Sequence, residues 1–167
     1  SLQGEPLGPT LHLLYRLAMG ACAGKPGYTE ISEGEFLTLY GGAGVRLDPD
    51  LVLMAESREG EPVGFVLSFP NTVPPQAGSN GDLPALNIMT VGILPPYRGM
   101  GLGKALVAEV YRRALRKGYR SAHHCLIPEG SPAAAFDAGL GRVHKRYALY
   151  ELVLEGPDGR ASRAPAA

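Results

Sequence analysis

The feature that most limits the fold is a glycine-rich turn, "PPYRGMGLGKAL", at residues 95–106. Glycines at 99, 101 and 103 alternate with larger residues, and an apolar helical pattern follows them. A glycine inside a helix costs about 1 kcal/mol relative to alanine, so three at a helix start need a reason. Such a turn exposes backbone N–H groups at the positive end of a helix, which suits an anion and above all phosphate. The sequence therefore predicts a strand–turn–helix unit that binds a phosphorylated ligand.

Two familiar phosphate-binding patterns do not fit this turn. The dinucleotide pattern GxGxxG, counted from Gly99, finds Lys104 in place of its third glycine. The P-loop pattern GxxxxGK[ST] finds Arg98 at its first glycine and Ala105 at its last position. A nucleotide-binding module is therefore disfavoured. The pattern [RQ]xxGx[GA] does fit, as Arg98-Gly99-Met100-Gly101-Leu102-Gly103.

Composition excludes several classes of protein. The 167 residues include 16 Lys plus Arg and 16 Asp plus Glu, and this zero net charge argues against a general nucleic-acid binder. The two cysteines match no metal-ligand spacing and form no disulfide framework. No apolar run approaches the length of a membrane helix, about 18 residues. We expect a cytoplasmic monomer or homodimer with no metal, nucleic-acid or membrane partner. We expect a linker or leader at 1–10, one domain at 11–155 and a disordered tail at 156–167.

Hydrophobic periodicity predicts an α/β (α+β) fold with one mixed sheet and helices on both faces. The pattern predicts helices at 11–23, 32–41, 101–117 and 131–139, the second of them opened by a Ser32–Glu35 capping box. It predicts strands at 51–57, 63–69, 85–94, 119–127 and 142–154, with the first two forming a hairpin. Gly92 indicates a bulge or a close backbone approach. The long loop at 70–84 is expected to be functional.

The stretch "TVGILPPYRGMGLGKALV" resembles the signature strand, pyrophosphate loop and helix of the GNAT family, the Gcn5-related N-acetyltransferases. The resemblance runs from about Leu51 to Leu154. It implies the GNAT acyl-CoA N-acyltransferase fold, with a central sheet that splays at the signature strand. It also implies that the pantetheine of acetyl-CoA pairs with the main chain of Val91, Gly92 and Ile93. The pyrophosphate would be held by Arg98, Gly99, Met100, Gly101, Leu102, Gly103 and Lys104.

A second family motif, "NxxAxxFYExLGF", resembles "GSPAAAFDAGLGR" at 130–142. The resemblance adds Ser131 and Phe136 to the expected CoA site. Asp137 stands where the family often has a tyrosine that protonates the departing thiolate. The chain also shows no strand pattern before Leu11, where GNAT domains usually have one. These departures concern the catalytic acid and the amino end.

Acetyl transfer to an amine needs a base near the thioester, a donor for its carbonyl oxygen and a proton for the thiolate. His123 and His124 are candidate bases, although only one can face the cleft because strand side chains alternate. The backbone N–H near Ile93 is the candidate donor. The remaining candidates are a base at Glu56, acids at Tyr147, Tyr150 or Asp137, and a nucleophile at Cys125.

Two functions fit these features. The first is an acetyl-CoA-dependent N-acetyltransferase that moves acetyl directly to a primary amine on a small molecule or peptide. The alternative is a GNAT-like module that binds acyl-CoA as a sensor or scaffold. The acceptor site is expected between the 70–84 loop and the first two helices. These segments contain no acidic cluster of the kind that would announce a polyamine or an aminoglycoside.

Overall fold

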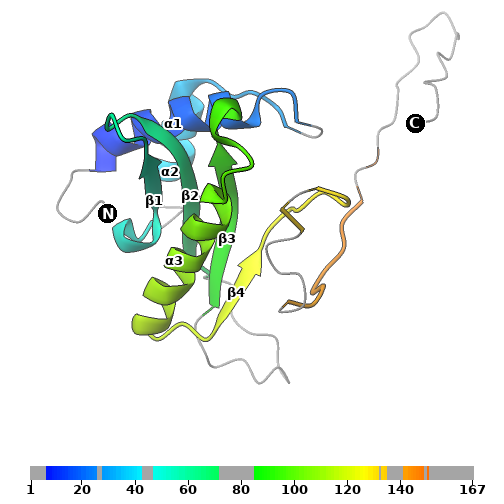
Figure 1. Cartoon of the computed structure of the whole chain (residues 1–167). Coiled ribbons are helices and arrows are strands. Elements are labelled where there is room, and N and C mark those ends of the chain that lie inside the picture. The colour runs from blue at the N-terminus through cyan, green and yellow to red at the C-terminus, as the bar shows by residue number, and fades with distance from the viewer. Residues whose placement is uncertain are drawn as a thin grey trace, which may run out of the picture. The chain divides into compact units, whose positions relative to one another are not determined.

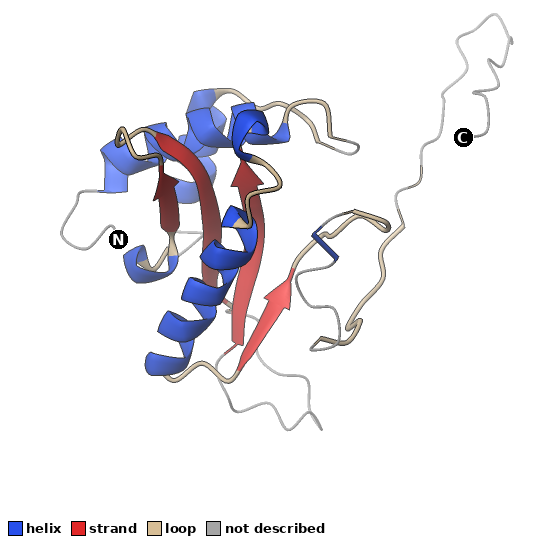
Figure 2. Cartoon of the chain, in the orientation of Figure 1, coloured by secondary structure: helices blue, strands red, loops and turns tan. Residues whose placement is uncertain are grey.

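The computed structural model describes residues 7–25, 28–42, 47–71, 85–131, 133–134, 141–148 and 150. The chain divides into two units, residues 1–136 and 137–167. All helices and strands of the described residues lie in the first unit (Figures 1 and 2). The helices are α1 (Leu7–Cys22), α2 (Glu33–Gly41) and α3 (Leu102–Arg116), with short 3-10 turns η1 (Pro49–Leu51) and η2 (Pro95–Tyr97). The strands are β1 (Leu53–Glu56), β2 (Pro62–Pro70), β3 (Ala85–Ile93) and β4 (Ser121–His124).

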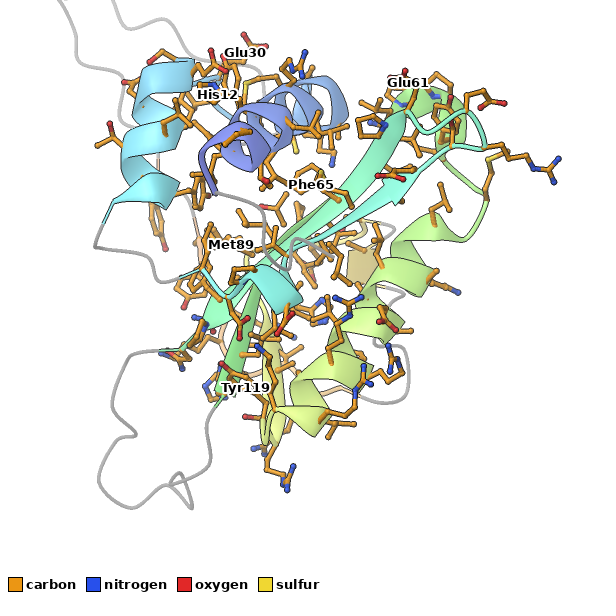
Figure 3. The ribbon with its side chains drawn as sticks, turned by 90° about the vertical axis from the view of Figure 1, so that its left-hand side faces the viewer. His12, Glu30, Glu61, Phe65, Met89 and Tyr119 are labelled. Carbon is orange, nitrogen blue, oxygen red and sulfur yellow. The ribbon has the colours of Figure 1, made fainter. Side chains whose placement is uncertain are left out.

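The four strands form one mixed sheet in the order β1-β2-β3-β4. The first three strands are antiparallel, whereas β3 and β4 are parallel. Successive side chains of β2 enter different cores: Phe65 packs with α1 and α2, and Val66 packs with α3. Figure 3 shows Phe65 on the α1 side of the sheet. The predicted α/β class, the hairpin and the helices on both faces are confirmed.

Most predicted elements form, with shifted ends. The capping box at Ser32 is present, with Glu35 accepting from the Ser32 backbone N–H at 2.7 Å. Helix α1 starts at Leu7, one turn before the predicted start, because Pro9 is tolerated in a first helical turn. The first predicted strand begins only at Leu53, since η1 takes its first residue.

The predicted strand at 142–154 is wrong over its described part. Residues 141–148 and 150 adopt no regular structure. Val143 and Tyr147 are 70% and 74% exposed there. Alternating apolar residues produce a strand only where a neighbouring strand supplies hydrogen bonds, and no ladder partner pairs with these residues in the described part of the chain. Most of the predicted 70–84 loop, most of the 131–139 helix and the predicted tail lie outside the described residues.

Helix α3 is anchored at the end farther from the glycine turn. Lys117, which follows its last residue, bonds Asp48 at 2.6 Å and Asp50 at 2.7 Å. Val110 is fully buried against the sheet. Gly118 ends the helix in the left-handed conformation, with φ of 91°. The helix is therefore held at its carboxyl end and along its buried face.

Gly92 is a close-approach glycine, as one of the two sequence interpretations proposed. A Cβ at this position would fall inside the contact distance of the Phe65 ring and 3.0 Å from Ala21 Cβ on α1. We expect Gly92→Ala to lower the free energy of unfolding by about 1–3 kcal/mol through overpacking, measured by urea denaturation. Gly34→Ala in α2 is the matched control, because nothing lies within 4 Å of its Cβ. Equal stability of the two variants would contradict this packing.

Candidate active site

The strands β3 and β4 separate halfway along β3. Their pairing runs from Ala85–Ser121 to Ile88–His124, and the Cys125 N–H donates to the Ile88 carbonyl at 3.0 Å. Beyond that point β3 continues to Ile93, while β4 leaves its side (Figure 1). A register shift against β2 leaves Met89 as a bulged residue where the strands part. This slot beside β3 is the splay that the sequence predicted.

The polar main-chain groups of β3 face the slot at alternate residues. Leu94 N–H donates to the Val63 carbonyl, so Leu94, Gly92 and Thr90 direct their N–H and C=O groups toward β2. Val91 and Ile93 then direct theirs toward the slot. The Ile93 carbonyl accepts a hydrogen bond from Arg98 Nε at 3.1 Å. Val91 and the Ile93 N–H are thus the groups placed to pair with an extended ligand.

The glycine turn presents an open, donor-rich surface. Gly99 and Gly101 adopt φ of 78° and 80°, a conformation that other residues rarely take. The first hydrogen bond of α3 runs from the Ala105 N–H to the Gly101 carbonyl at 3.0 Å, so the amides of residues 102–104 precede the helical ladder. Nothing lies within 4 Å of a Cβ built on Gly99 or Gly101. Lys104 is exposed at the same helix end, and Met100 is 70% exposed.

The Arg98 side chain ties the turn to two other elements. Its Nη2 donates to the Ala21 carbonyl in the last turn of α1 at 3.0 Å, and its Nε donates to the end of β3. The guanidinium is therefore engaged with the protein's own carbonyls. The prediction that Arg98 helps to hold a pyrophosphate therefore depends on its main chain.

The two histidines of β4 lie on opposite faces of the sheet. His124 pairs in register with Ile88, which packs against α3, and its Nε2 lies 2.6 Å from the Tyr111 hydroxyl of α3. His123 pairs with Asn87 and so has its side chain on the α1 and α2 face. Only one of the two can therefore face the cleft, and its role as a base stays a prediction.

The other catalytic candidates are dispersed. Glu56 is exposed at the end of β1, two strands from β3 and so roughly 10 Å away at the usual strand spacing. Burial raises the pKa of the Cys125 thiol, which leaves less thiolate to act as a nucleophile. Tyr147 and Tyr150 belong to the second unit and are exposed, and Phe136 and Asp137 lie outside the described residues. Ser131 Oγ is buried with no hydrogen-bond partner among the described residues.

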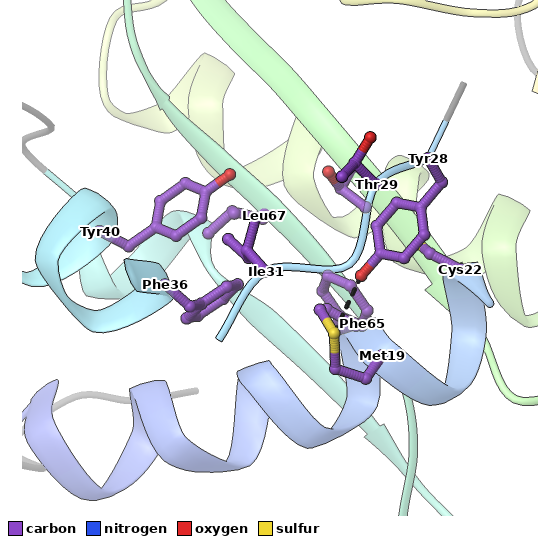
Figure 4. Close-up of a pocket in the computed structure, with 11 residues that line it drawn as sticks. Met19, Cys22, Tyr28, Thr29, Ile31, Phe36, Tyr40, Phe65 and Leu67 are labelled. Atoms are coloured by element: carbon purple, nitrogen blue, oxygen red, sulfur yellow. Dashed lines mark hydrogen bonds between the residues drawn. The ribbon is translucent and has the colours of Figure 1, made fainter. Parts of the chain in front are cut away.

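A pocket that the sequence did not reveal lies on the α1 and α2 face (Figure 4). Its volume is about 140 Å³. Thr90, from the splayed half of β3, forms part of its wall. The other lining residues are Ala18, Met19, Cys22, Tyr28, Thr29, Ile31, Phe36, Tyr40, Phe65 and Leu67. Tyr28 and Tyr40 belong to no local motif. Tyr28 follows the first expected helix and Tyr40 lies in the second, and their place beside the expected acceptor site was the only sequence signal for this pocket.

The described residues contain no helix long and apolar enough to cross a membrane. They also contain no group of three or more His, Cys, Asp or Glu residues placed to hold a metal ion.

Solved structures share this architecture at low sequence identity. An aminoglycoside acetyltransferase, meta-AAC0020, from an uncultured soil metagenomic sample in complex with sisomicin, has 15% identity and a TM-score of 0.58, covering 88% of this chain and 90% of that chain. AAC(6')-Iy in complex with the bisubstrate analogue CoA-S-monomethyl-acetylneamine has 18% identity and a TM-score of 0.59, covering 88% and 94%. A transcriptional regulator from Bacillus halodurans C-125 has 16% identity and a TM-score of 0.60, covering 87% and 95%. These likenesses show the fold alone.

Sequence comparison identifies the family. No curated protein matches the chain. The model of the acetyltransferase (GNAT) family matches residues 14–136, more than half of the 167 residues. The matched range includes the splayed strand, the glycine turn and the two histidines of β4. The chain therefore belongs to the GNAT family of acetyltransferases.

Proposed function

We propose that this N-acetyltransferase uses acetyl-CoA and transfers the acetyl group directly to the primary amine of a small molecule or peptide. The observation that carries the proposal is the glycine turn, with its open left-handed glycines placed beside the splay of β3. The fold neighbour AAC(6')-Iy binds a CoA bisubstrate analogue, which supports the choice of acetyl-CoA. We propose a cytoplasmic enzyme whose domain spans 11–155 and acts without a metal.

The residues present fit coenzyme A. No protein atom occupies the space over Gly99 and Gly101, where a larger residue would place its Cβ. The backbone N–H groups of residues 102–104 suit a pyrophosphate. Val91 and Ile93 offer a strand edge for pantetheine. Ser131 Oγ is buried without a hydrogen-bond partner among the described residues, and we propose that the ligand supplies one. Lys104 adds positive charge at the mouth of the turn.

The reaction exchanges one bond for another. The amine nitrogen attacks the thioester carbonyl carbon, a C–N bond forms, and the C–S bond breaks with its electron pair going to sulfur. One proton leaves nitrogen and one reaches sulfur, so the products are an amide and a free thiol. The Ile93 N–H is placed to donate to the carbonyl oxygen as negative charge develops on it.

We assign the base to His123, because its side chain shares the α1 and α2 face with the pocket. His124 is held by Tyr111 on the other face, and we assign it a packing role. Direct transfer agrees with the raised pKa of the Cys125 thiol, which disfavours an acetylated cysteine intermediate. Glu56 can act only through a chain of water molecules.

Isothermal titration with acetyl-CoA and with CoA tests this function, followed by an assay of thiol release with a panel of amines. We expect micromolar dissociation constants and amine-dependent thiol release. Binding without transfer to any amine or peptide would instead support the acyl-CoA sensor. The absence of binding to any acyl-CoA would overturn both functions.

A further inference from the structure

The pocket on the α1 and α2 face has no charged side chain in its described lining. Its wall is made of aromatic rings, aliphatic groups, a thiol and two threonines. Burial raises the pKa of the Tyr40 phenol, and the nearby Cys22 adds to the effect. Burial followed by Cys22 acts in the same direction on the pKa of Tyr28, whose hydroxyl contacts Met19 Sδ at 3.1 Å. Both phenols therefore stay neutral, and the pocket offers no anion to a cationic group.

Two acidic residues near this pocket bond other groups. Glu33 bonds His12 at 2.9 Å, and Glu35 accepts hydrogen bonds from Ser32 in the capping box. Glu30 is exposed beside Thr29 and outside the lining, although its charge helps to raise the pKa of the Tyr28 phenol. A polycation would therefore lose hydration on entering this pocket without gaining a charge partner from the described lining.

The size of the pocket limits what can fill it. Its volume of about 140 Å³ is close to that of an engineered apolar cavity, roughly 150 Å³, which stays dry and binds benzene. Phe36 and Tyr40 pack with ring centroids 4.7 Å apart on one side, and Phe65 and Leu67 rise from β2 on another. Figure 4 shows these side chains turned toward a common space. One aromatic ring or branched aliphatic group matches it.

The pocket and the slot where the thioester is expected share the splayed half of β3. Thr90 contributes its side chain to the lining, and its neighbour Val91 directs its main chain into the slot. An amine on a short linker can therefore reach the slot while its apolar group stays in the pocket. The uncharged surroundings also favour the neutral, nucleophilic form of that amine.

We propose that the acceptor is a primary amine linked by one or two carbons to a single uncharged ring, the class represented by phenethylamine. This inference rests on the proposed acetyltransferase function and adds the substrate class. The ring occupies the pocket of aromatic side chains, and the amine points along Thr90 toward the splayed half of β3.

Rates of thiol release at saturating acetyl-CoA test the class. We expect kcat/KM for phenethylamine to exceed that for butylamine or putrescine by about 10- to 100-fold, the usual gain from burying a ring-sized apolar group. We expect sisomicin to be acetylated no better than putrescine. Equal or higher kcat/KM with putrescine or sisomicin would overturn the inference while leaving acetyl transfer intact.

A charge placed at the rim provides the matched variant. Thr29 is exposed at the pocket, so Thr29→Asp adds a carboxylate without disturbing the core. We expect the phenethylamine-to-putrescine ratio of kcat/KM to fall by about 10-fold. Thr38→Asp, on an exposed part of α2 outside the lining, should leave the ratio unchanged. An unchanged ratio in Thr29→Asp would contradict the assignment of this pocket.

Binding separates this inference from the proposed function. Phenethylamine is titrated into the protein loaded with CoA, where no transfer can occur. Binding of phenethylamine relative to putrescine that falls in Thr29→Asp but not in Thr38→Asp supports the pocket, even if acetyl transfer is absent and the enzyme proposal fails. If acetyl transfer occurs with other amines and phenethylamine does not bind, the substrate class is wrong and the function stands.

Discussion

Gly101→Val should raise the dissociation constant of acetyl-CoA by about 100-fold or more. Gly101 is the residue before α3 and has φ of 80°, which a β-branched side chain takes only with strain. If the backbone changed conformation to relieve that strain, the N–H groups of residues 102–104 would point in other directions. An isopropyl group would also enter the open space over the turn. Isothermal titration measures the change.

Gly118→Val is the matched control, because it has the same kind of backbone and the same open surroundings at the opposite end of α3. Its φ is 91°, and nothing lies within 4 Å of its Cβ. The two variants should lose similar thermal stability, but Gly118→Val should keep its acetyl-CoA affinity within about threefold. Arg98→Ala should weaken binding less than Gly101→Val, since its guanidinium already bonds Ala21 and Ile93. Equal loss of affinity in both valine variants would place the effect in folding.

His123→Ala should lower kcat/KM for the amine acceptor by about 100-fold, the usual contribution of a positioned base. In the unmodified enzyme kcat/KM should rise with pH over the range in which an imidazole loses its proton, because only the neutral form accepts a proton. That rise should disappear in the variant. The affinity for acetyl-CoA should stay unchanged, since His123 lies on the face opposite α3.

His124→Gln is the comparison for this experiment. Its side chain contacts Tyr111 under α3, so we expect lower stability with the pH profile retained. A loss of rate and of the pH-dependent rise in His124→Gln alone would reverse the assignment of the two faces. Full rate in both variants would show that neither histidine is the base and would leave Glu56 or water.

The parts of this fold that could be predicted depend on residues close together in the sequence. The glycines of the turn at 95–106 indicate a left-handed backbone, and the capping box needs only Ser32 and Glu35. The central position of β3 follows from an apolar pattern on both faces. The parallel partner β4 follows from the strand–helix–strand order. These features allowed the family and the CoA side of the site to be predicted.

The parts that sequence reasoning missed depend on distant residues. Arg98 bonds a carbonyl 77 positions earlier in the chain, which no motif specifies. Gly92 is the close-approach glycine and the bulge lies at Met89, where an unbranched apolar residue gives no signal of irregular pairing. Tyr28 and Tyr40 have the same apolar character as core residues, so only their packing reveals a pocket. The pattern at 142–154 looks like a strand, yet its described residues lack a ladder.

The bulge at Met89 interrupts the alternation of side chains between the two faces of β3. Leu86 and Ile88 turn toward α3, and an unbroken alternation would turn Thr90 the same way. The extra residue instead sends Thr90 to the pocket and Val91 to the α3 side. Removing Met89 would join Ile88 directly to Thr90, so ordinary alternation would keep every later residue of β3 on its present face while the bulge itself disappeared. The extra residue therefore adds length to β3 at the point where β4 departs, and a single-codon deletion here would remove the irregular pairing while the pocket wall and the α3 core kept the same side chains.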